Sequence, residues 1–158
     1  MCLIVDANVR NLLSERNSLV NAWLNGQTGN PRLVAGGKLL EELANKEDVG
    51  KRLIELERAG RLRSPDRTML SWEETRLRRD GRCVSNDHHV LALAIVSGAR
   101  TLATNDDDLI GDFKNKAIID QPRGSVYRDV PEHKRLLRHT PESCGVHSSD
   151  DPGPRRRH

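Results

Sequence analysis

The stretch Cys2-Leu-Ile-Val-Asp-Ala-Asn8 decides how this chain of 158 residues folds. Its first four residues form a continuous apolar run, which is typical of a strand buried on both faces of a parallel sheet. Asp6 follows directly, so a carboxylate stands at the carboxyl end of the predicted strand. Because parallel α/β sheets bind their ligands beyond the carboxyl ends of the strands, this edge is the first place to look for a site.

The rest of the chain alternates short apolar runs with segments of helical periodicity. After the first strand, the apolar residues between Leu12 and Leu24 recur at helical spacing. Further strands are predicted at residues 32–36, 61–64, 101–104 and 117–119. Further helices are predicted at residues 37–45, 47–59, 65–80, 85–97 and 106–114, with Pro65 in a first turn and Ser85 as an N-cap. Alternating strands and helices joined by short connections imply an α/β fold with a parallel sheet covered by helices.

Composition limits the class of protein. A chain of this length suits one domain with a sizeable core. The formal net charge of +3 fits a polyanionic partner such as nucleic acid, while an aromatic content of 3% argues against a base-stacking sheet. Three cysteines match no zinc-binding spacing. The longest apolar run, residues 90–96, is far shorter than the roughly 20 residues of a membrane span, so we expect a cytoplasmic protein with no membrane partner.

Four acidic residues occupy comparable places around the predicted sheet. Asp6 and Asp106 each follow a strand, Glu42 lies on the helix after the second strand, and Asp87 lies at the start of an apolar helix. Taken singly, each is an ordinary turn or cap residue. Their coincidence at one edge favours a shared site.

The helix at residues 37–45 offers two glutamates, and the choice between them follows from its apolar face. At about 100° per residue, Glu42 lies roughly 105° from the centre of that face and Glu41 roughly 155°. Glu42 is therefore expected on the flank, where a site can use it, and Glu41 in solvent.

Clustered carboxylates without a cysteine ligand suit a hard cation, Mg²⁺ or Mn²⁺. His88 and His89 are adjacent, so on a helix they point about 100° apart and are poorly placed to chelate one ion together. A hard cation binds phosphate oxygens and lowers the pKa of a bound water, which is the chemistry of phosphodiester hydrolysis. An aspartyl-phosphate mechanism usually requires a second carboxylate two residues after Asp6. That position is Asn8, which argues against this mechanism.

Four short motifs together resemble the PIN-domain (PilT N-terminus-like) nuclease family. They are LIVDAN at 3–8, GGKLLEEL at 36–43, SNDHHVLALA at 85–94 and LATNDDDL at 102–109. The resemblance implies a PIN-like domain over residues 1–128, built as a three-layer α/β/α sandwich with a central parallel sheet. It implies a metal-dependent endoribonuclease whose catalytic, metal-binding carboxylates are Asp6, Glu42, Asp87 and Asp106. It also implies supporting roles for Asn8, Thr104 and Asp108, although Leu109 replaces the aromatic residue that usually follows the last of these.

The resemblance carries expectations about partners as well. It suggests an RNA substrate, a homodimer, and membership of a toxin–antitoxin pair in which an antitoxin would be the protein inhibitor. The segment at residues 61–82 is longer than the corresponding segment in the compact toxin members of the family. The alternatives are a non-catalytic RNA- or partner-binding PIN-like domain and a DNA-directed or structure-specific nuclease.

Two further segments carry predictions. A basic run on the helix at 65–80 and just beyond it is a candidate for binding RNA phosphates, although interspersed acids make a solvated helix face an equal alternative. Its members are Arg76, Arg78, Arg79 and Arg82. Residues 129–139 are expected to contain a C-terminal helix, and residues 140–158, rich in Pro, Ser, Asp and Gly, a disordered tail.

Overall fold

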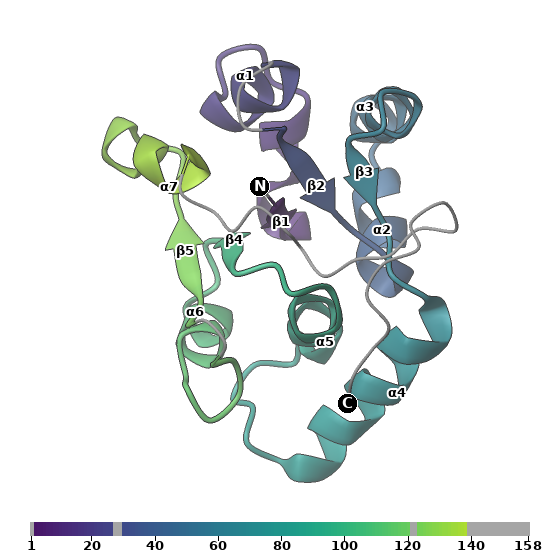
Figure 1. The fold of residues 1–158 in the computed structure, drawn as a ribbon, viewed down its shortest axis with the longest axis vertical. Helices are drawn as coiled ribbons and strands as arrows, with labels where there is room; N and C mark the ends of the chain where they lie inside the picture. Colours follow the sequence, from purple (N-terminus) through teal and green to yellow (C-terminus); the bar gives the residue numbers. More distant parts are fainter. Residues whose placement is uncertain (1, 27–29, 121–122, 139–158) are drawn as a thin grey trace.

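The structure, a computed structural model, describes residues 2–26, 30–120 and 123–138. Its five strands form one sheet in the order β3-β2-β1-β4-β5, and every pair of neighbouring strands is parallel. The strands are β1 (Cys2–Val5), β2 (Arg32–Val34), β3 (Leu62–Arg63), β4 (Thr101–Ala103) and β5 (Ser125–Tyr127). Helices cover both faces of the sheet, with α1 and α3 above and α5 and α6 below in Figure 1. The predicted three-layer α/β/α fold is confirmed.

Strand β1 lies at the centre of the sheet. All four of its residues are buried, as the continuous apolar run predicted. From β1 the chain order runs outward in two directions, to β2 and β3 on one side and to β4 and β5 on the other. The backbone amide of Asp6 extends the pairing with β4 by one bond, donating to the Ala103 carbonyl at 2.9 Å. Asp6 is thereby fixed at the point where the strand order reverses, which is the usual ligand-binding crevice of such sheets.

The helices follow the predicted pattern with small shifts at their ends. They are η1 (Ala7–Leu13), α1 (Leu19–Asn25), α2 (Gly37–Ala44), α3 (Glu47–Arg58), α4 (Arg67–Asp80), α5 (His88–Ser97), α6 (Asp107–Phe113), η2 (Pro131–His133) and α7 (Lys134–Arg138). Helix α4 begins two residues after Pro65, because the Asp66 carboxylate caps it by accepting a bond from the Thr68 amide at 2.7 Å. Helix α5 is buried around most of its circumference, which explains its nearly continuous apolar sequence.

Helical spacing between Leu12 and Leu24 does not produce one continuous helix. The chain forms the 3-10 helix η1, leaves helical structure, and starts α1 only at Leu19. Ser18 causes the restart, since its hydroxyl accepts a bond from the Asn21 amide at 3.1 Å and donates to the Leu12 carbonyl at 2.7 Å. A capping serine inside an apolar periodic segment therefore divided it.

The prediction of a strand at residues 117–119 is wrong. These residues form a turn, and Ile119 is buried there without pairing in the sheet. The last strand is instead β5, which lies beside β4 with Thr101 opposite Ser125. Gly124, just before β5, lets the chain pass close to the end of α6, because a Cβ at this position would stand 2.5 Å from the Phe113 carbonyl oxygen.

Beyond β5 the described chain packs back onto the same core. Leu137 of α7 is buried, and the Asp129 carboxylate accepts bonds from the Tyr127 hydroxyl at 2.7 Å and the Leu19 amide at 3.2 Å. Helices η2 and α7 lie inside the segment 129–139 where a C-terminal helix was expected. The tail predicted at 140–158 lies outside the described residues. Among the described helices, none has the length and apolar character needed to cross a bilayer.

Candidate active site

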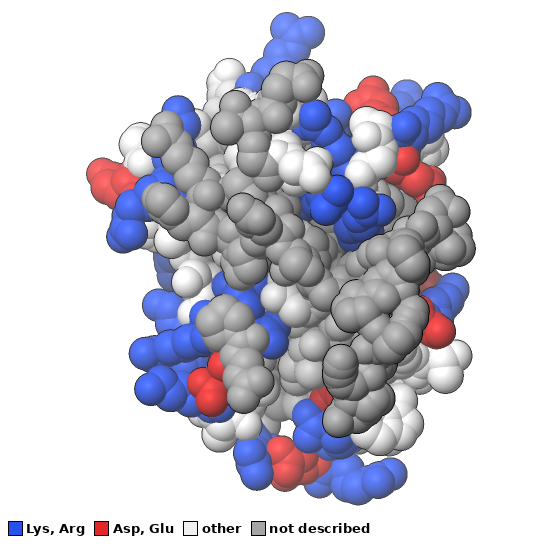
Figure 2. Space-filling model, in the orientation of Figure 1, with Lys and Arg blue, Asp and Glu red and all other residues white. Residues whose placement is uncertain are grey.

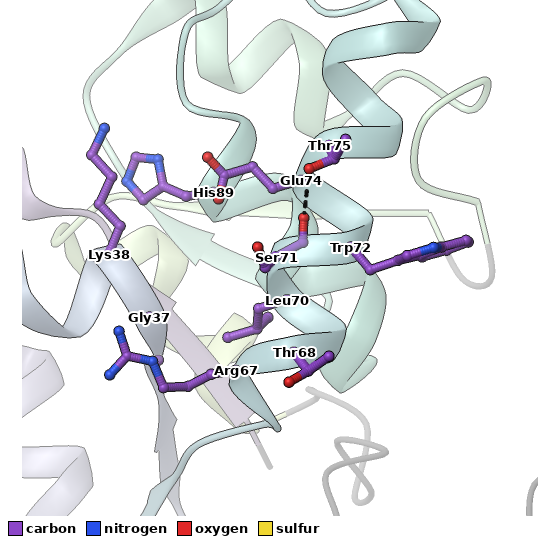
Figure 3. A pocket seen from close by; sticks show the side chains of 11 residues that line it. Gly37, Lys38, Arg67, Thr68, Leu70, Ser71, Trp72, Glu74, Thr75 and His89 are labelled. Carbon is purple, nitrogen blue, oxygen red and sulfur yellow. Dashed lines mark hydrogen bonds between the residues drawn. The ribbon is translucent and has the colours of Figure 1, made fainter.

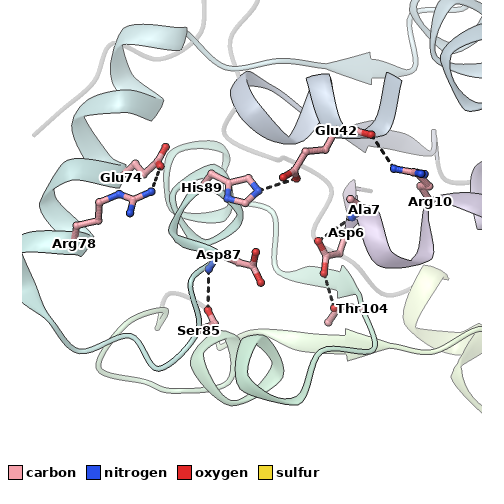
Figure 4. Close-up of polar contacts among 10 residues, drawn as sticks. All are labelled: Asp6, Ala7, Arg10, Glu42, Glu74, Arg78, Ser85, Asp87, His89 and Thr104. Carbon is pink, nitrogen blue, oxygen red and sulfur yellow. Dashed lines mark hydrogen bonds and ion pairs between the residues drawn. The ribbon is translucent and has the colours of Figure 1, made fainter. Parts of the chain in front are cut away.

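Asp6 lies buried at the end of β1 and is held by two hydrogen bonds. Its Oδ1 accepts a bond from the Ala7 amide and its Oδ2 a bond from the Thr104 hydroxyl, each at 2.8 Å (Figure 4). Burial raises the pKa of Asp6 above its ordinary value of 3.8, and these two hydrogen bonds act in the opposite direction. The carboxylate is therefore oriented by the fold, and no Lys or Arg of the described residues forms an ion pair with it.

Thr104 connects the first strand to the fourth at this edge. Its hydroxyl donates to Asp6 and accepts bonds from the Asp106 amide at 3.1 Å and the Asn8 side-chain amide at 3.5 Å. Asn8 and Thr104, both predicted to support the acids, thus contact one another, and Thr104 also contacts Asp6. Thr104 is a positioning residue for the carboxylate.

Replacing Thr104 with valine tests that role. Valine keeps the shape but removes the bond to Asp6, so the pKa of Asp6 should rise further. Outer partners of metal-binding side chains typically contribute about 10- to 100-fold to metal affinity or activity, and we expect a loss in that range. Mn²⁺ affinity measured by calorimetry would show it. An unchanged affinity, with serine at the same position behaving like valine, would contradict the role.

Asp87 points into the same space from another direction. It is the N-cap residue of α5, yet its carboxylate makes no capping bond and no other hydrogen bond to the described residues. Figure 4 shows it directed toward the region between Asp6 and the side chains of α2 and α5. Burial raises the pKa of Asp87, and the nearby charge of Asp6 raises it next; Asp106 and Glu42 act in the same direction and His89 opposes them. Ser85, the predicted N-cap, only accepts a bond from the Asp87 amide at 3.3 Å, so that prediction is wrong.

Glu42 reaches the site from the flank of α2 and pairs with His89. The His89 Nε2 and the Glu42 Oε1 lie 3.0 Å apart, and the histidine is almost fully buried. Sequence reasoning weighed His89 only as a poor co-ligand of His88 and did not predict its pairing with Glu42, although a polar residue on a helix that is apolar nearly all round must find a partner. Glu41 faces solvent and contacts Arg67 at 3.5 Å, as its angular position predicted.

The three consecutive aspartates that follow β4 differ in their contacts and exposure. Asp106 caps α6, its Oδ1 accepting bonds from the Asp108 amide at 3.0 Å and the Leu109 amide at 3.2 Å. Its Oδ2 accepts no bond from the described residues. The side chains of Asp107 and Asp108 are exposed, and among the described residues Asp107 has a single ionic contact, with Arg128 at 4.0 Å. Of the three, Asp106 is the one placed beside Thr104.

Asp112 was not foreseen, and it fixes the loop that carries Asp87. This carboxylate is 2% exposed and accepts bonds from the Val84 amide at 3.0 Å and the Ser85 amide at 2.9 Å. Helix α6 therefore anchors the backbone two residues before Asp87. No sequence signal distinguished Asp112 from a surface acid.

The four candidate carboxylates are of the chemical type that binds a hard cation. In this structure, however, their side chains do not point at one common position. Within residues 2–26, 30–120 and 123–138, no three His, Cys, Asp or Glu side chains form a group that could hold a metal ion. Glu42 is turned to His89 and Asp106 to its own helix. The carboxylates nevertheless lie near enough to raise the pKa of Asp87 together. Carboxylate oxygens with this uncompensated charge are the ligands that Mg²⁺ and Mn²⁺ prefer.

Basic side chains border the acids on two sides. Arg10 donates to the Glu42 carbonyl at 3.2 Å and lines a hollow with Asn8 and Lys46. On the other side, a cleft beginning at His89 contains Lys38. Figure 2 shows Lys and Arg widely spread over one face of the molecule and mixed with acids.

The predicted basic run is largely engaged in local ion pairs. Arg76 pairs with Glu73, Arg78 with Glu74 at 2.7 Å, and Arg82 with Asp80 at 3.0 Å. Arg79 is exposed. The pairs match the solvated helix face that was the alternative for this segment.

Comparison of the chain with protein-family models, with curated proteins and with solved structures finds no match. The PIN-domain resemblance therefore stays a prediction. The function has to be argued from the site itself.

Proposed function

We propose that the chain is a metal-dependent endoribonuclease, PIN-like in its site, that hydrolyses phosphodiester bonds with Mg²⁺ or Mn²⁺. One observation carries the proposal. Asp6 and Asp87 face a common space at the reversal point of the strand order, and the pKa of each is raised. Perturbed carboxylates in such a crevice are typical of functional sites, and a cation would remove their repulsion.

Each carboxylate has a role in this proposal. Asp6, Asp87 and Asp106 would hold the ion, and Glu42 would assist them or hold a second one. The bound ion would supply an activated water and stabilise charge on the leaving oxygen. Thr104 keeps the Asp6 carboxylate oriented, and His89 keeps Glu42 at the edge of the site. No side chain of the protein has to act as the nucleophile.

The bordering cations are suited to a polyanionic substrate. Arg10 and Lys46 on one side and Lys38 on the other would contact phosphates that flank the reacting one. A protein inhibitor of the antitoxin kind and a homodimer remain predictions from the resemblance alone.

A second candidate is a non-catalytic RNA-binding domain of the same fold. It is favoured by the side chains of Glu42 and Asp106, which are already bonded within the protein. Such a domain would bind RNA equally well with and without a divalent cation and would never cleave it.

Metal-dependent cleavage of labelled RNA is the deciding measurement. We expect cleavage with Mg²⁺ or Mn²⁺, none in excess chelator, and loss of activity on Asp106→Asn. The matched control is Asp107→Asn, whose exposed side chain should make its replacement nearly silent. Cleavage that persists in chelator, or equal activity of the two variants, would rule out the proposed mechanism.

A further inference from the structure

A pocket of about 170 Å³ lies between η1 and the carboxyl ends of β4 and β5. It is smaller and more enclosed than the cleft between α2 and α4 that Figure 3 shows, whose volume is about 610 Å³. Asn8 and Thr104 line the smaller pocket, and the Thr104 hydroxyl donates to Asp6 at 2.8 Å. A ligand in this pocket would therefore lie one side chain away from Asp6, at the edge of the sheet where such folds bind their ligands.

Part of the pocket wall is apolar. Val9 and Leu12 line it from η1, and Ala103 and Tyr127 line it from the ends of β4 and β5. Tyr127 is fully buried, and its hydroxyl is already bonded to Asp129 at 2.7 Å. Sites for drug-sized ligands measure roughly 300–1,000 Å³, so this pocket suits a smaller group with apolar faces, such as a single nucleobase.

Two charged side chains with unused hydrogen-bonding capacity complete the lining. The Asp129 carboxylate accepts one bond at each oxygen, from the Tyr127 hydroxyl and the Leu19 amide, whereas a carboxylate can accept about four in all. The side chain of Arg128 is 50% exposed, and its single ionic contact among the described residues is the 4.0 Å approach to Asp107. Such a contact contributes little and leaves the guanidinium available. The pocket therefore offers a ligand both a cationic donor and an anionic acceptor.

Guanine is the base whose hydrogen-bonding groups match this pair of side chains. Its O6 and N7 atoms are neighbouring acceptors, which arginine binds in a bidentate manner. Its N1 and exocyclic amino group are neighbouring donors, which suit the two oxygens of a carboxylate. Adenine, cytosine and uracil each lack at least one of these two pairs. In a single strand all of these groups are free to be read.

We propose that this pocket binds one guanine base of the RNA substrate, next to the bond that is cut, and so makes cleavage selective for guanine. Arg128 donates to O6 and N7, and Asp129 accepts from N1 and the exocyclic amino group. The inference rests on the proposed function and extends it, because it names the residues that determine the specificity of the same site.

Binding can be measured apart from cleavage, by calorimetry with the four nucleoside monophosphates in buffer that contains a chelator. Guanosine monophosphate should bind with a Kd of about 1 mM or tighter. It should bind at least about tenfold more tightly than the other three, because a good bidentate pair discriminates between bases by about that factor. Inosine monophosphate lacks the exocyclic amino group, so it should bind more weakly than guanosine monophosphate.

Two variants test the two proposed contacts. Arg128→Ala should lower the affinity for guanosine monophosphate about tenfold. Asp129→Asn removes one acceptor oxygen, so this variant should bind guanosine and inosine monophosphates equally. Circular dichroism would show whether Asp129→Asn is folded, since the carboxylate also holds the Leu19 amide. The Arg128 test is independent of that question, because its side chain is exposed.

Matched controls lie in the same segment of the chain. Arg135 and Glu132 are exposed and do not line the pocket. Arg135→Ala and Glu132→Gln should therefore leave the affinity for guanosine monophosphate unchanged. In the presence of Mn²⁺, an RNA strand with a single guanine should be cut beside that guanine by the unsubstituted protein, and Arg128→Ala should lose this preference.

Three binding results would overturn the inference. They are equal binding of the four nucleotides, no binding of any of them, and equal affinities of the Arg128→Ala and Arg135→Ala variants. Guanine-selective binding that depends on Arg128, without metal-dependent cleavage of any RNA, would support the pocket and refute the nuclease. Metal-dependent cleavage that ignores both guanine and Arg128 would refute the pocket and leave the nuclease standing.

Discussion

Replacing Asp87 with asparagine is expected to abolish metal-dependent cleavage while raising the midpoint of thermal unfolding in metal-free buffer. Removal of outer partners of a metal ligand already costs about 10- to 100-fold, so loss of a proposed direct ligand should cost at least about 100-fold. The folded state should become more stable, because the Asp87 carboxylate makes no hydrogen bond to the described chain. Burial and the charge of Asp6 both disfavour its ionised form.

The pH dependence follows from the direction of the shift. Because the pKa of Asp87 is raised in the folded state, the native protein holds this proton more firmly than the unfolded chain. The firmer binding of this proton raises the free energy of unfolding. That stabilisation is complete below the ordinary pKa of 3.8 and is lost as pH rises through the pKa of Asp87 in the folded protein. Asp6 acts in the same direction. The advantage of the Asp87→Asn variant should therefore grow as pH rises from 3 toward neutrality, which thermal melts across that range would measure.

Added metal should reverse the order of stability. At 100 times its dissociation constant, a bound ion would stabilise the unsubstituted protein by about 2.7 kcal/mol, and the Asp87→Asn variant should gain much less. Asp107→Asn is the control and should respond to metal like the unsubstituted protein. A variant that melts lower than the parent in chelator, or that gains equally from Mn²⁺, would show that Asp87 is structural.

Replacing Asp112 with alanine is expected to destabilise the fold most strongly among the polar substitutions considered. The change leaves the Val84 and Ser85 amides without their acceptor. Bonds to a buried charged acceptor contribute roughly 1.5–3 kcal/mol each, partly offset here by removal of a buried charge, so we expect a loss of about 2–3 kcal/mol. For a chain of this size that corresponds to a fall in the thermal midpoint of roughly 4–12 °C.

The same variant should lose activity beyond its loss of stability. The freed loop carries Asp87, so cleavage measured well below the melting temperature should fall as well. Asp112→Asn keeps one acceptor oxygen and should lie between alanine and the parent in both measurements. Asp120→Ala, at an exposed acid, is the control. A stable Asp112→Ala variant would mean that the loop holds its shape without the carboxylate.

Much of the fold followed from pattern alone because burial on both faces leaves a plain signal. The run Cys2–Val5 could hardly form anything but a central strand, and the acids that follow strands fell at one edge once the sheet was parallel. The strand Ser125–Tyr127 was missed because three residues carry little periodicity. The apolar residues at 117–119 competed with it, but they form no strand, and of the three only Ile119 is buried.

The parts of the site that escaped prediction depend on tertiary neighbours. His89 and Asp112 look like ordinary polar residues until the folded chain places Glu42 beside one and the Val84–Ser85 backbone beside the other. Local sequence gives the position of a side chain along its element. It does not give the partner that a distant segment supplies.

The bond between the Thr104 hydroxyl and Asp6 joins residues that are 98 positions apart in the chain. Contacts of such long sequence separation form late in folding and require most of the chain to be present. During synthesis, the carboxylate of Asp6 therefore has no correctly formed surroundings until β4 has left the ribosome and docked beside β1. A site built in this way would reach its working geometry only near the completion of the fold.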